Sequence, residues 1–309
     1  MSKYILKRLL LLLVVILGVS FLIYFIMDMA PGDLARTILG EEATIEELEE
    51  LRHELGLDQP VIVRYPKYMW NLLHGDLGYS YKYGEAVWDL YVQRLPATLL
   101  LALSATIVST LLSIPMGIYA ALKRGTLQDN VVSGLSIIGL AAPHYWVGLM
   151  LIILFALNLG WFNSGGYENW KDVILPAITV GTGHMALVTR TTRSSMIDVL
   201  GQDYLMLARA KGVAEKKVVT KHALKNALIP IITVTGMNFS SALGGSVITE
   251  SVFSWPGVGR LIIDAIRSQD VDTVTGSIIM TAIITSVLLL LVDILYAFVD
   301  PRIKAQYSK

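Results

Sequence analysis

Apolar residues in this chain form long runs, in contrast to the alternating or three-to-four-residue spacing of amphipathic elements. An α-helix needs about 20 apolar residues to cross the hydrocarbon core of a membrane. Six runs approach or exceed that length, and the fourth is the least apolar: 9–27, 97–122, 131–160, 174–189, 229–249 and 276–299. The pattern predicts an all-α integral membrane protein with six transmembrane helices, the first at 9–29.

Composition excludes an ordinary soluble domain. Hydrophobic residues make up 54% of the chain and charged residues 16%, and there is no cysteine, so disulfides and thiolate metal sites are ruled out. The first apolar run could also be the core of a secretory signal peptide. It exceeds the usual ~7–15 residues of such a core, however, and Asp28 and Pro31 spoil a cleavage site. We therefore expect it to remain as a span.

Basic residues are concentrated in the segments that the six-helix pattern places on one side of the membrane. The positive-inside rule assigns that side to the cytoplasm, so both termini are expected to be inside. The basic residues concerned are Lys3, Lys7, Arg8, Lys123, Arg124, Arg190, Arg193, Arg209, Lys211, Lys216, Lys217, Lys221, Lys225, Arg302, Lys304 and Lys309. The expected layout is one transmembrane domain over 1–309, with an extracytoplasmic loop at 30–96, a five-helix core at 97–300 and a cytoplasmic tail at 301–309.

The outer loop at 30–96 contains a predicted amphipathic helix. Thr44 and Glu47 have the spacing of a capping box, and Ile45, Leu48 and Leu51 recur at helical intervals. Two roles stay open for this helix, packing on the outer rim or contact with a delivered partner protein. Further along, aromatic residues typical of a membrane interface crowd the approach to the second span: Trp70, Tyr79, Tyr81, Tyr83, Trp88 and Tyr91.

The inner loop at 197–230 is basic and compatible with helix, yet too polar to cross a membrane. Asp203 is expected to cap a short helix that Gly212 ends in a left-handed conformation. A second helical stretch is expected at 214–226, and Pro230 to mark the return into the membrane. Tyr204, Leu207, Ala208 and Lys211 would share one face of the first helix. Two short helices that meet at a glycine form a knob suited to a groove in another subunit.

Polar residues inside the spans are candidates for a translocation pathway, because burying them in a membrane is costly. Pro143 and His144 interrupt the third span, and His184 lies in the weak fourth span. The fifth span carries a polar and small strip, which close helix packing would also explain. Its members are Asn238, Ser240, Ser241, Gly244, Gly245 and Ser246. For the two histidines, a structural hydrogen bond is the alternative to contact with substrate.

The outer return after the fifth span, 250–260, begins at Glu250 and is rich in glycine. Pro256 and Gly257 fit the central pair of a type II turn, and Gly259 follows. An apolar helical face is expected next, formed by Leu261, Ile262, Ala265 and Ile266. The segment could gate the outer mouth or simply cap the bundle, and both roles stay open.

Several segments, in order along the whole chain, resemble the permeases of ABC importers of the dipeptide, oligopeptide and nickel family. They are APGD at 30–33, LGLDQP at 55–60, RLPATLLL at 94–101, RSSM at 193–196, DYLMLARAKG at 203–212, HALKNALIP at 222–230 and ESVFSWPGVGRL at 250–261. The inner loop is similar to the EAA loop of that family, although Met206, Leu207 and Ala208 replace its Glu-Ala-Ala and Ala214 stands where serine or threonine would cap better.

The resemblance implies a type I ABC importer permease fold with a cytoplasmic coupling helix, in the inner membrane of a bacterium or archaeon. It implies as partners a second, homologous permease subunit, two cytoplasmic ATPases that bind ATP and Mg, an extracytoplasmic substrate-binding protein and membrane lipid, with no nucleic acid. This chain would bind no cofactor. The residues it assigns to ATPase coupling are Asp203, Tyr204, Ala208, Lys211, Gly212, His222, Leu224 and Pro230.

The motifs of other function classes are missing from the sequence. There is no G-x4-G-K-[ST] phosphate-binding loop, so ATP hydrolysis is expected on another polypeptide. His53 and Glu54 lack the second histidine of H-E-x-x-H, and no G-x-S-x-G occurs, so an intramembrane hydrolase is not favoured. An ion-coupled secondary transporter is the remaining alternative, although it would not require the basic inner loop. The choice between peptides and nickel chelates as substrate stays open.

Overall fold

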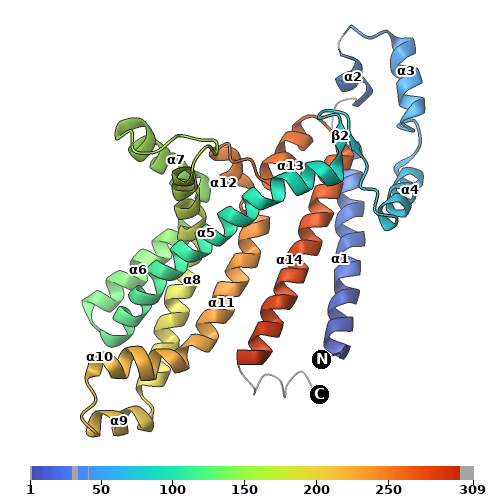
Figure 1. Cartoon of the computed structure of the whole chain (residues 1–309). Helices are drawn as coiled ribbons and strands as arrows, with labels where there is room; N and C mark the ends of the chain where they lie inside the picture. The colour runs from blue at the N-terminus through green and yellow to red at the C-terminus, as the bar shows by residue number, and fades with distance from the viewer. Residues whose placement is uncertain (1, 30–33, 41, 300–309) are drawn as a thin grey trace. The chain divides into compact units, whose positions relative to one another are not determined.

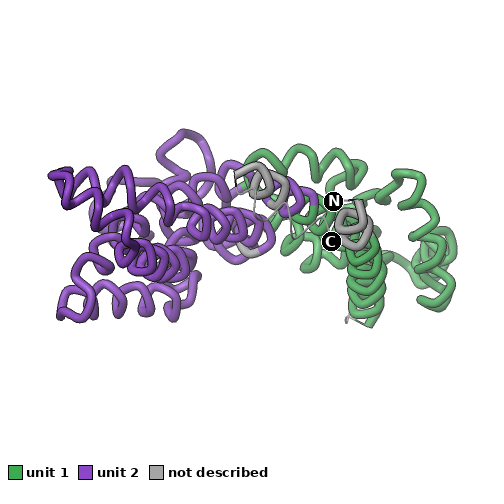
Figure 2. The backbone as a smooth tube through the Cα atoms, turned by 90° about the horizontal axis from the view of Figure 1, so that it is seen from below, with its two compact units in different colours: residues 1–98, 256–286 green, residues 99–255, 287–309 purple. Residues whose placement is uncertain are grey.

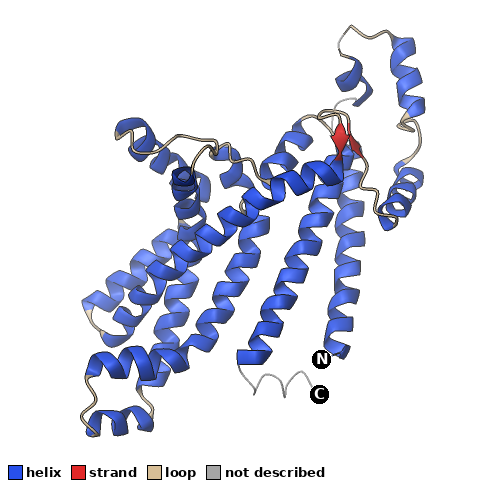
Figure 3. Ribbon diagram, in the orientation of Figure 1, coloured by secondary structure: helices blue, strands red, loops and turns tan. Residues whose placement is uncertain are grey.

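The structure, a computed structural model, describes residues 2–29, 34–40 and 42–299. The APGD segment at 30–33 and the expected tail at 301–309 lie outside the described residues. Helices dominate, and Figure 3 shows strands only as one small hairpin, β1 (Tyr79–Ser80) and β2 (Glu85–Ala86). In the described part of the chain, five helices are long and apolar enough to cross a membrane, and a helix pair bent by 99° makes a sixth candidate if it is counted as one span. The expected all-α membrane architecture is confirmed.

The chain forms two compact units, coloured separately in Figure 2. The first comprises residues 1–98 and 256–286, and the second residues 99–255 and 287–309. The long helices α5 (Val87–Leu122) and α14 (Val271–Val299) contribute to both. Helix α5 begins ten residues before the span expected at 97, because the helix continues beyond its purely apolar part.

The first unit contains the N-terminal span and the outer loop. Tyr24 of α1, Tyr68 of α4 and Ile279 of α14 form its buried centre. Thr44 caps α3 with the reciprocal bonds of a capping box, as predicted: its hydroxyl accepts from the Glu47 N–H at 3.3 Å, and its own N–H donates to the Glu47 carboxylate at 2.8 Å. The helices here are α1 (Ser2–Met29), α2 (Leu34–Leu39), α3 (Ile45–Glu54), α4 (Val61–Leu73) and α13 (Val258–Arg267).

The second unit is arranged around α8, which packs against α6, α7 and α11. Figure 1 shows α9 and α10 together at one end of α8 and α11, with α7 and α12 at the other end. Its elements are α6 (Leu127–Ala141), α7 (His144–Leu151), the π-helical turn η1 (Ile152–Asn158), the 3-10 turn η2 (Trp170–Val173), α8 (Ile174–Leu200), α9 (Asp203–Ala210), α10 (Glu215–Lys217), the π-helical turn η3 (Val218–Ala223), α11 (Leu224–Gly245) and α12 (Val247–Val252).

The third span is broken where the sequence predicted an interruption. Helix α6 ends at Ala141, and the chain resumes as α7 after Pro143 at an angle of 99°. Proline disfavours helical geometry in the residue before it, and Ala142 is extended with φ −70° and ψ 126°. The second half of this span therefore points away from the first.

Close packing of α5 on α8 depends on Gly117. A β-carbon at this position would lie 2.5 Å from Cβ of Thr192 and 2.7 Å from the carbonyl oxygen of Thr189. We expect Gly117→Ala to lower the free energy of unfolding by about 1 to 3 kcal/mol, because helix backbone must move apart to admit the methyl group. The midpoint of thermal unfolding of the purified protein, followed by size-exclusion chromatography, measures this effect.

The matched control for Gly117 is Gly134→Ala on α6, where an added β-carbon meets no atom within 4 Å. Alanine is a better helix former than glycine by about 1 kcal/mol, so this variant should unfold at an unchanged or slightly higher temperature. Equal midpoints for the two variants would show that the α5–α8 contact is not tight.

Candidate functional site: the inner loop and the polar residues of the spans

The inner loop contains a short helix, α9, with a turn at each end. Helix α8 ends at Gly201, α9 runs from Asp203 to Ala210, and the chain reverses at Gly212. Gly212 has φ +77°, so the predicted left-handed glycine is confirmed. The turn is closed by backbone bonds from the N–H of Gly212 to the Arg209 carbonyl at 2.9 Å and from the N–H of Val213 to the Ala208 carbonyl at 3.2 Å.

Two details predicted for this loop are wrong. The N-cap of α9 is Gln202, which is extended at φ −83° and ψ 144°, and Asp203 is the first helical residue. At that position the Asp203 carboxylate still faces the positive end of the helix dipole. The second helical stretch does not end before the span, because η3 runs directly into α11 and Pro230 lies inside that helix. Ala214 caps α10 without a side-chain hydrogen bond, at the position predicted for it.

The loop stands on an apolar base formed by α8, α9 and η3. Leu205, Val218 and Ala223 have no exposed surface, and the partly buried Ala208, Val213 and Leu224 pack against the same cluster. Leu205 anchors α9 and was not predicted, because nothing local distinguishes it from the other leucines of the chain. The base therefore links the position of α9 to the ends of α8 and α11.

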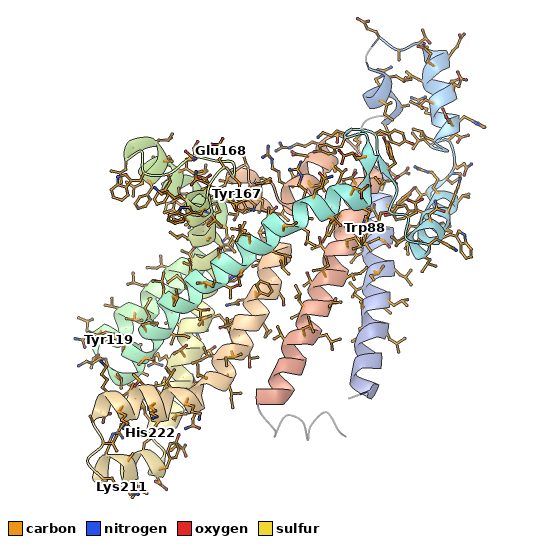
Figure 4. All side chains as sticks on the ribbon, viewed as in Figure 1. Trp88, Tyr119, Tyr167, Glu168, Lys211 and His222 are labelled. Carbon is orange, nitrogen blue, oxygen red and sulfur yellow. The ribbon has the colours of Figure 1, made fainter. Side chains whose placement is uncertain are left out.

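The exposed surface of the inner loop has apolar side chains at its centre and basic side chains at its edges. Tyr204, Met206 and Leu207 are exposed, Met206 by 60%. Lys211 is exposed, and His222 is half-buried. Figure 4 labels Lys211 at the end of α9 and His222 on the segment that follows. Of the residues predicted to couple to a partner, Tyr204, Lys211 and Gly212 are accessible, whereas Ala208 and Leu224 belong to the base.

An ion pair spans the Gly212 turn. Arg209 donates from Nε and Nη2 to the two carboxylate oxygens of Glu215, at 3.0 Å and 2.9 Å. Hydrogen bonding to Glu215 raises the pKa of Arg209 above its usual value. The pair connects α9 to α10, but it is exposed and therefore contributes little to stability.

A second, more buried ion pair lies at the same end of α8. Arg193 donates to both carboxylate oxygens of Asp129, from Nε at 2.6 Å and from Nη2 at 2.7 Å. Asp129 is only 2% exposed and also accepts a hydrogen bond from the backbone N–H of Gly125 at 3.0 Å. The pair thus holds the turn between α5 and α6 against α8. Arg193 was expected among the cytoplasmic basic residues and in the RSSM segment, but its pairing with Asp129 was not predicted.

Three of the four predicted pathway residues meet around α8. His144, the first residue of α7, packs its ring against Gly183, and its Nδ1 lies 3.4 Å from the carbonyl oxygen of Thr179. Asn238 is buried and donates to the carbonyl oxygen of His184 at 3.4 Å. The buried Nδ1 of His184 has no hydrogen-bond partner among the described residues. Ser241 is not part of this group, since it is exposed on α11.

The second unit also contains an apolar groove. Its volume is about 470 Å³, and α5, α11 and Val292 line it. Thr106, Thr110 and Thr235 supply its hydroxyl groups, and those of Thr110 and Thr235 have no partner in the described part of the chain. None of the four predicted pathway residues lines the groove. The i, i+4 spacing of the two threonines on α5 is the signal that could have drawn attention to it.

The residues predicted for the outer gate fall in both units. Glu250 of α12 is fully buried in the second unit and accepts a hydrogen bond from the hydroxyl of Ser246 at 3.0 Å. In the first unit, Gly257 has φ −99° and caps α13, so the predicted type II turn is wrong. The positive φ lies instead at Ser254, with 49°. Gly259 is buried, and of the predicted apolar face of α13, Ile266 is exposed while Leu261, Ile262 and Ala265 are buried.

The chain matches known protein families over most of its length. The family described as "Binding-protein-dependent transport system inner membrane component" matches residues 113–305, and the family described as its N-terminal part matches residues 1–102. The oligopeptide transport system permease protein AppB of Bacillus subtilis is 40% identical, covering 98% of this chain and 100% of that protein. The dipeptide transport system permease protein DppB of Escherichia coli K12 is 38% identical, covering 98% and 99%.

Among solved structures, the inward-facing MetNI methionine ABC transporter contains a similar chain. The TM-score is 0.59 at 16% sequence identity, covering 68% of this chain and 96% of that one. Identity this low indicates a shared fold and no more.

Proposed function

Because the chain belongs to the family of binding-protein-dependent transport system inner membrane components, we propose that it is the permease subunit of an ATP-driven importer of dipeptides or oligopeptides. The observation that carries the proposal is the knob around Gly212, which stands on the ends of α8 and α11 and presents Tyr204, Met206 and Leu207 outward. The peptide substrate is supported by the names of the relatives AppB and DppB. Nickel chelates are the second candidate substrate.

The knob is proposed to receive force from a cytoplasmic ATPase. Its exposed apolar centre suits a hydrophobic groove, and Lys211 suits an acidic rim of that groove. Since Leu205, Val218 and Ala223 join the knob to α8 and α11 in one buried cluster, displacement of α9 would move both spans. ATP and Mg would be bound by two such ATPases, and this chain would bind neither.

Transport is proposed to follow alternating access, with this chain forming half of the pathway and a second, homologous permease subunit the other half. Closure of the ATPases would open the cavity toward an extracytoplasmic binding protein, and hydrolysis would return it. His144, His184, Asn238 and Ser241 are the proposed pathway residues, and Glu250, Pro256, Gly257 and Gly259 the proposed outer gate. Both termini would lie in the cytoplasm, as the distribution of basic residues indicates.

The proposal is tested by reconstituting the complete complex in liposomes with its binding protein. Short peptides are expected to stimulate ATP hydrolysis and to accumulate inside only when ATP reaches the ATPases. Stimulation by nickel chelates but not by peptides would replace the proposed substrate. Uptake driven by a proton or sodium gradient without ATP would identify an ion-coupled secondary transporter and refute the proposal.

A further inference from the structure

Helix α4 of the first unit packs one face against two membrane spans. Tyr65, Tyr68, Met69 and Leu72 join a cluster that includes Tyr24 and Ile16 of α1 and Ile279 and Ile283 of α14. The hydroxyl of Tyr65 lies 3.0 Å from the carbonyl oxygen of Leu17 and 2.9 Å from Oγ of Ser20. Although α4 belongs to the loop expected outside the membrane, its contacts therefore extend from the ends of two spans into their interiors.

The positions of these partners give the depth of α4. The candidate span of α1 runs from Leu10 to Met29. At a rise of 1.5 Å per residue, Ser20 lies about 13 Å from the end of that span. On α14, Ile279 lies about 12 Å from the start of the helix at Val271 by the same rise. Two separate spans thus place the inner face of α4 below the outer membrane surface, and Figure 1 shows α4 beside the upper half of α1.

Beside the packed face, α4 exposes a set of large apolar side chains. Ile62 is 77% exposed, Leu73 is 76% exposed, and Trp70 lies between them, also exposed. A set of large apolar side chains of this kind is costly in water. The lipid-facing side of α1 exposes Phe21 and Leu22 at the level where Phe21 contacts Tyr65, with ring centroids 5.3 Å apart. The two apolar surfaces therefore occur at one depth.

The polar residues of α4 fit a membrane interface. Arg64 pairs with Asp28 near the outer end of α1, and Lys67 is exposed. Long basic side chains beside an apolar helix face extend their charges to the headgroups. The tyrosines and Trp70 are the aromatic residues that favour this region. In contrast, α3 of the same loop exposes glutamates such as Glu49 and Glu50.

We propose that α4 is an interfacial membrane helix, seated against α1 and α14 with Ile62, Trp70 and Leu73 among the acyl chains of the outer leaflet. Lipid is expected to cover the exposed apolar side chains of α4, because they continue the lipid-facing surface of α1. This inference requires only that α1 and α14 cross the membrane, and it is independent of the transported substrate. It would make the outer loop a membrane-anchored segment in place of a free one.

Site-directed spin labelling tests the proposal directly, because the chain contains no cysteine of its own. Ile62→Cys and Leu73→Cys are labelled with a nitroxide in the complete complex in liposomes, with the unsubstituted complex reporting any labelling of the other subunits. Leu22→Cys on α1 is the lipid reference, and Glu49→Cys on α3 is the aqueous reference. Accessibility to oxygen and to a water-soluble nickel chelate is measured by power saturation.

At positions 62 and 73 we expect oxygen accessibility to exceed nickel-chelate accessibility several-fold, as at position 22, and the reverse at position 49. Chelate accessibility equal to that of position 49 would place α4 in water and overturn the proposal. Low accessibility to both reagents would place a protein subunit on this face and overturn it equally. As a second measurement, we expect lipids brominated near the headgroup to quench less tryptophan fluorescence in the Trp70→Phe complex than in the unsubstituted complex.

Discussion

Replacement of Gly212 by valine is expected to abolish substrate uptake while leaving membrane insertion and ATP hydrolysis of the assembled complex intact. Gly212 has φ +77°, a conformation that costs a residue with a β-carbon about 1 to 2 kcal/mol and a β-branched residue more. Nothing else obstructs the substitution, since a β-carbon there meets no atom within 4 Å. Rotation of α9 about its turn would relieve the strain and would misplace Tyr204 and Leu207 with respect to the ATPase.

The control for Gly212 is Gly201→Val at the other end of α9. Gly201 is also exposed, but its φ of −83° and ψ of 0° lie outside the left-handed region, so valine there avoids the strain of a positive φ. This variant should transport peptide at the wild-type rate. Peptide accumulation and phosphate release are measured on the same proteoliposomes, so that loss of coupling is separated from loss of hydrolysis. Normal uptake by Gly212→Val would show that the geometry of this turn is not needed for coupling.

The second large effect is expected for Arg193→Ala, which should lower the free energy of unfolding by about 3 kcal/mol. The substitution leaves the carboxylate of Asp129 buried without its main partner, and a buried, unpaired charge is strongly destabilising. We place the value at the low end of the usual range because about a third of the Arg193 side chain reaches the surface. The midpoint of unfolding in a chemical denaturant, measured in detergent, reports the change.

A double-mutant cycle distinguishes this ion pair from a general packing effect. Combining Arg193→Ala with Asp129→Ala removes both charges, so the double variant should be more stable than the sum of the two single losses predicts. Arg209→Ala provides the matched control, because Arg209 makes the same kind of bidentate ion pair with Glu215 at an exposed site. That variant should unfold almost as the wild type does. Additive losses in the cycle would contradict the assigned pairing.

Local geometry was predictable at several positions where a residue's own backbone or its near neighbours decide it. The capping box at Thr44 and the left-handed turn at Gly212 were both predicted and are both present. The break of the third span at Pro143 follows from proline chemistry in the same way. The prediction of a type II turn at Pro256 and Gly257 is wrong, because the same dipeptide can also precede a helix, and Gly257 caps α13.

Residues that act through distant partners could not be found in this way. Asp129 and Arg193 lie on α6 and α8, and their spacing in the sequence contains no sign of their pairing. Leu205 is one leucine among many, and its burial depends on η3, which follows later in the chain. The predicted pathway residues are a further example. His144, His184 and Asn238 gather around α8, whereas Ser241, which follows Asn238 on the same span, is exposed.

From the sequence by itself came the membrane class, the all-α architecture and the turn at Gly212, because hydrophobicity, charge and glycine geometry act over a few residues or along one helix. Tertiary structure alone decided which polar residues pair and which face of α9 is anchored. It also decided that α4, which belongs to the outer loop, packs against interior positions of α1 and α14. These features depend on side chains brought together from different helices, and their energy comes from burial and pairing that no single segment possesses.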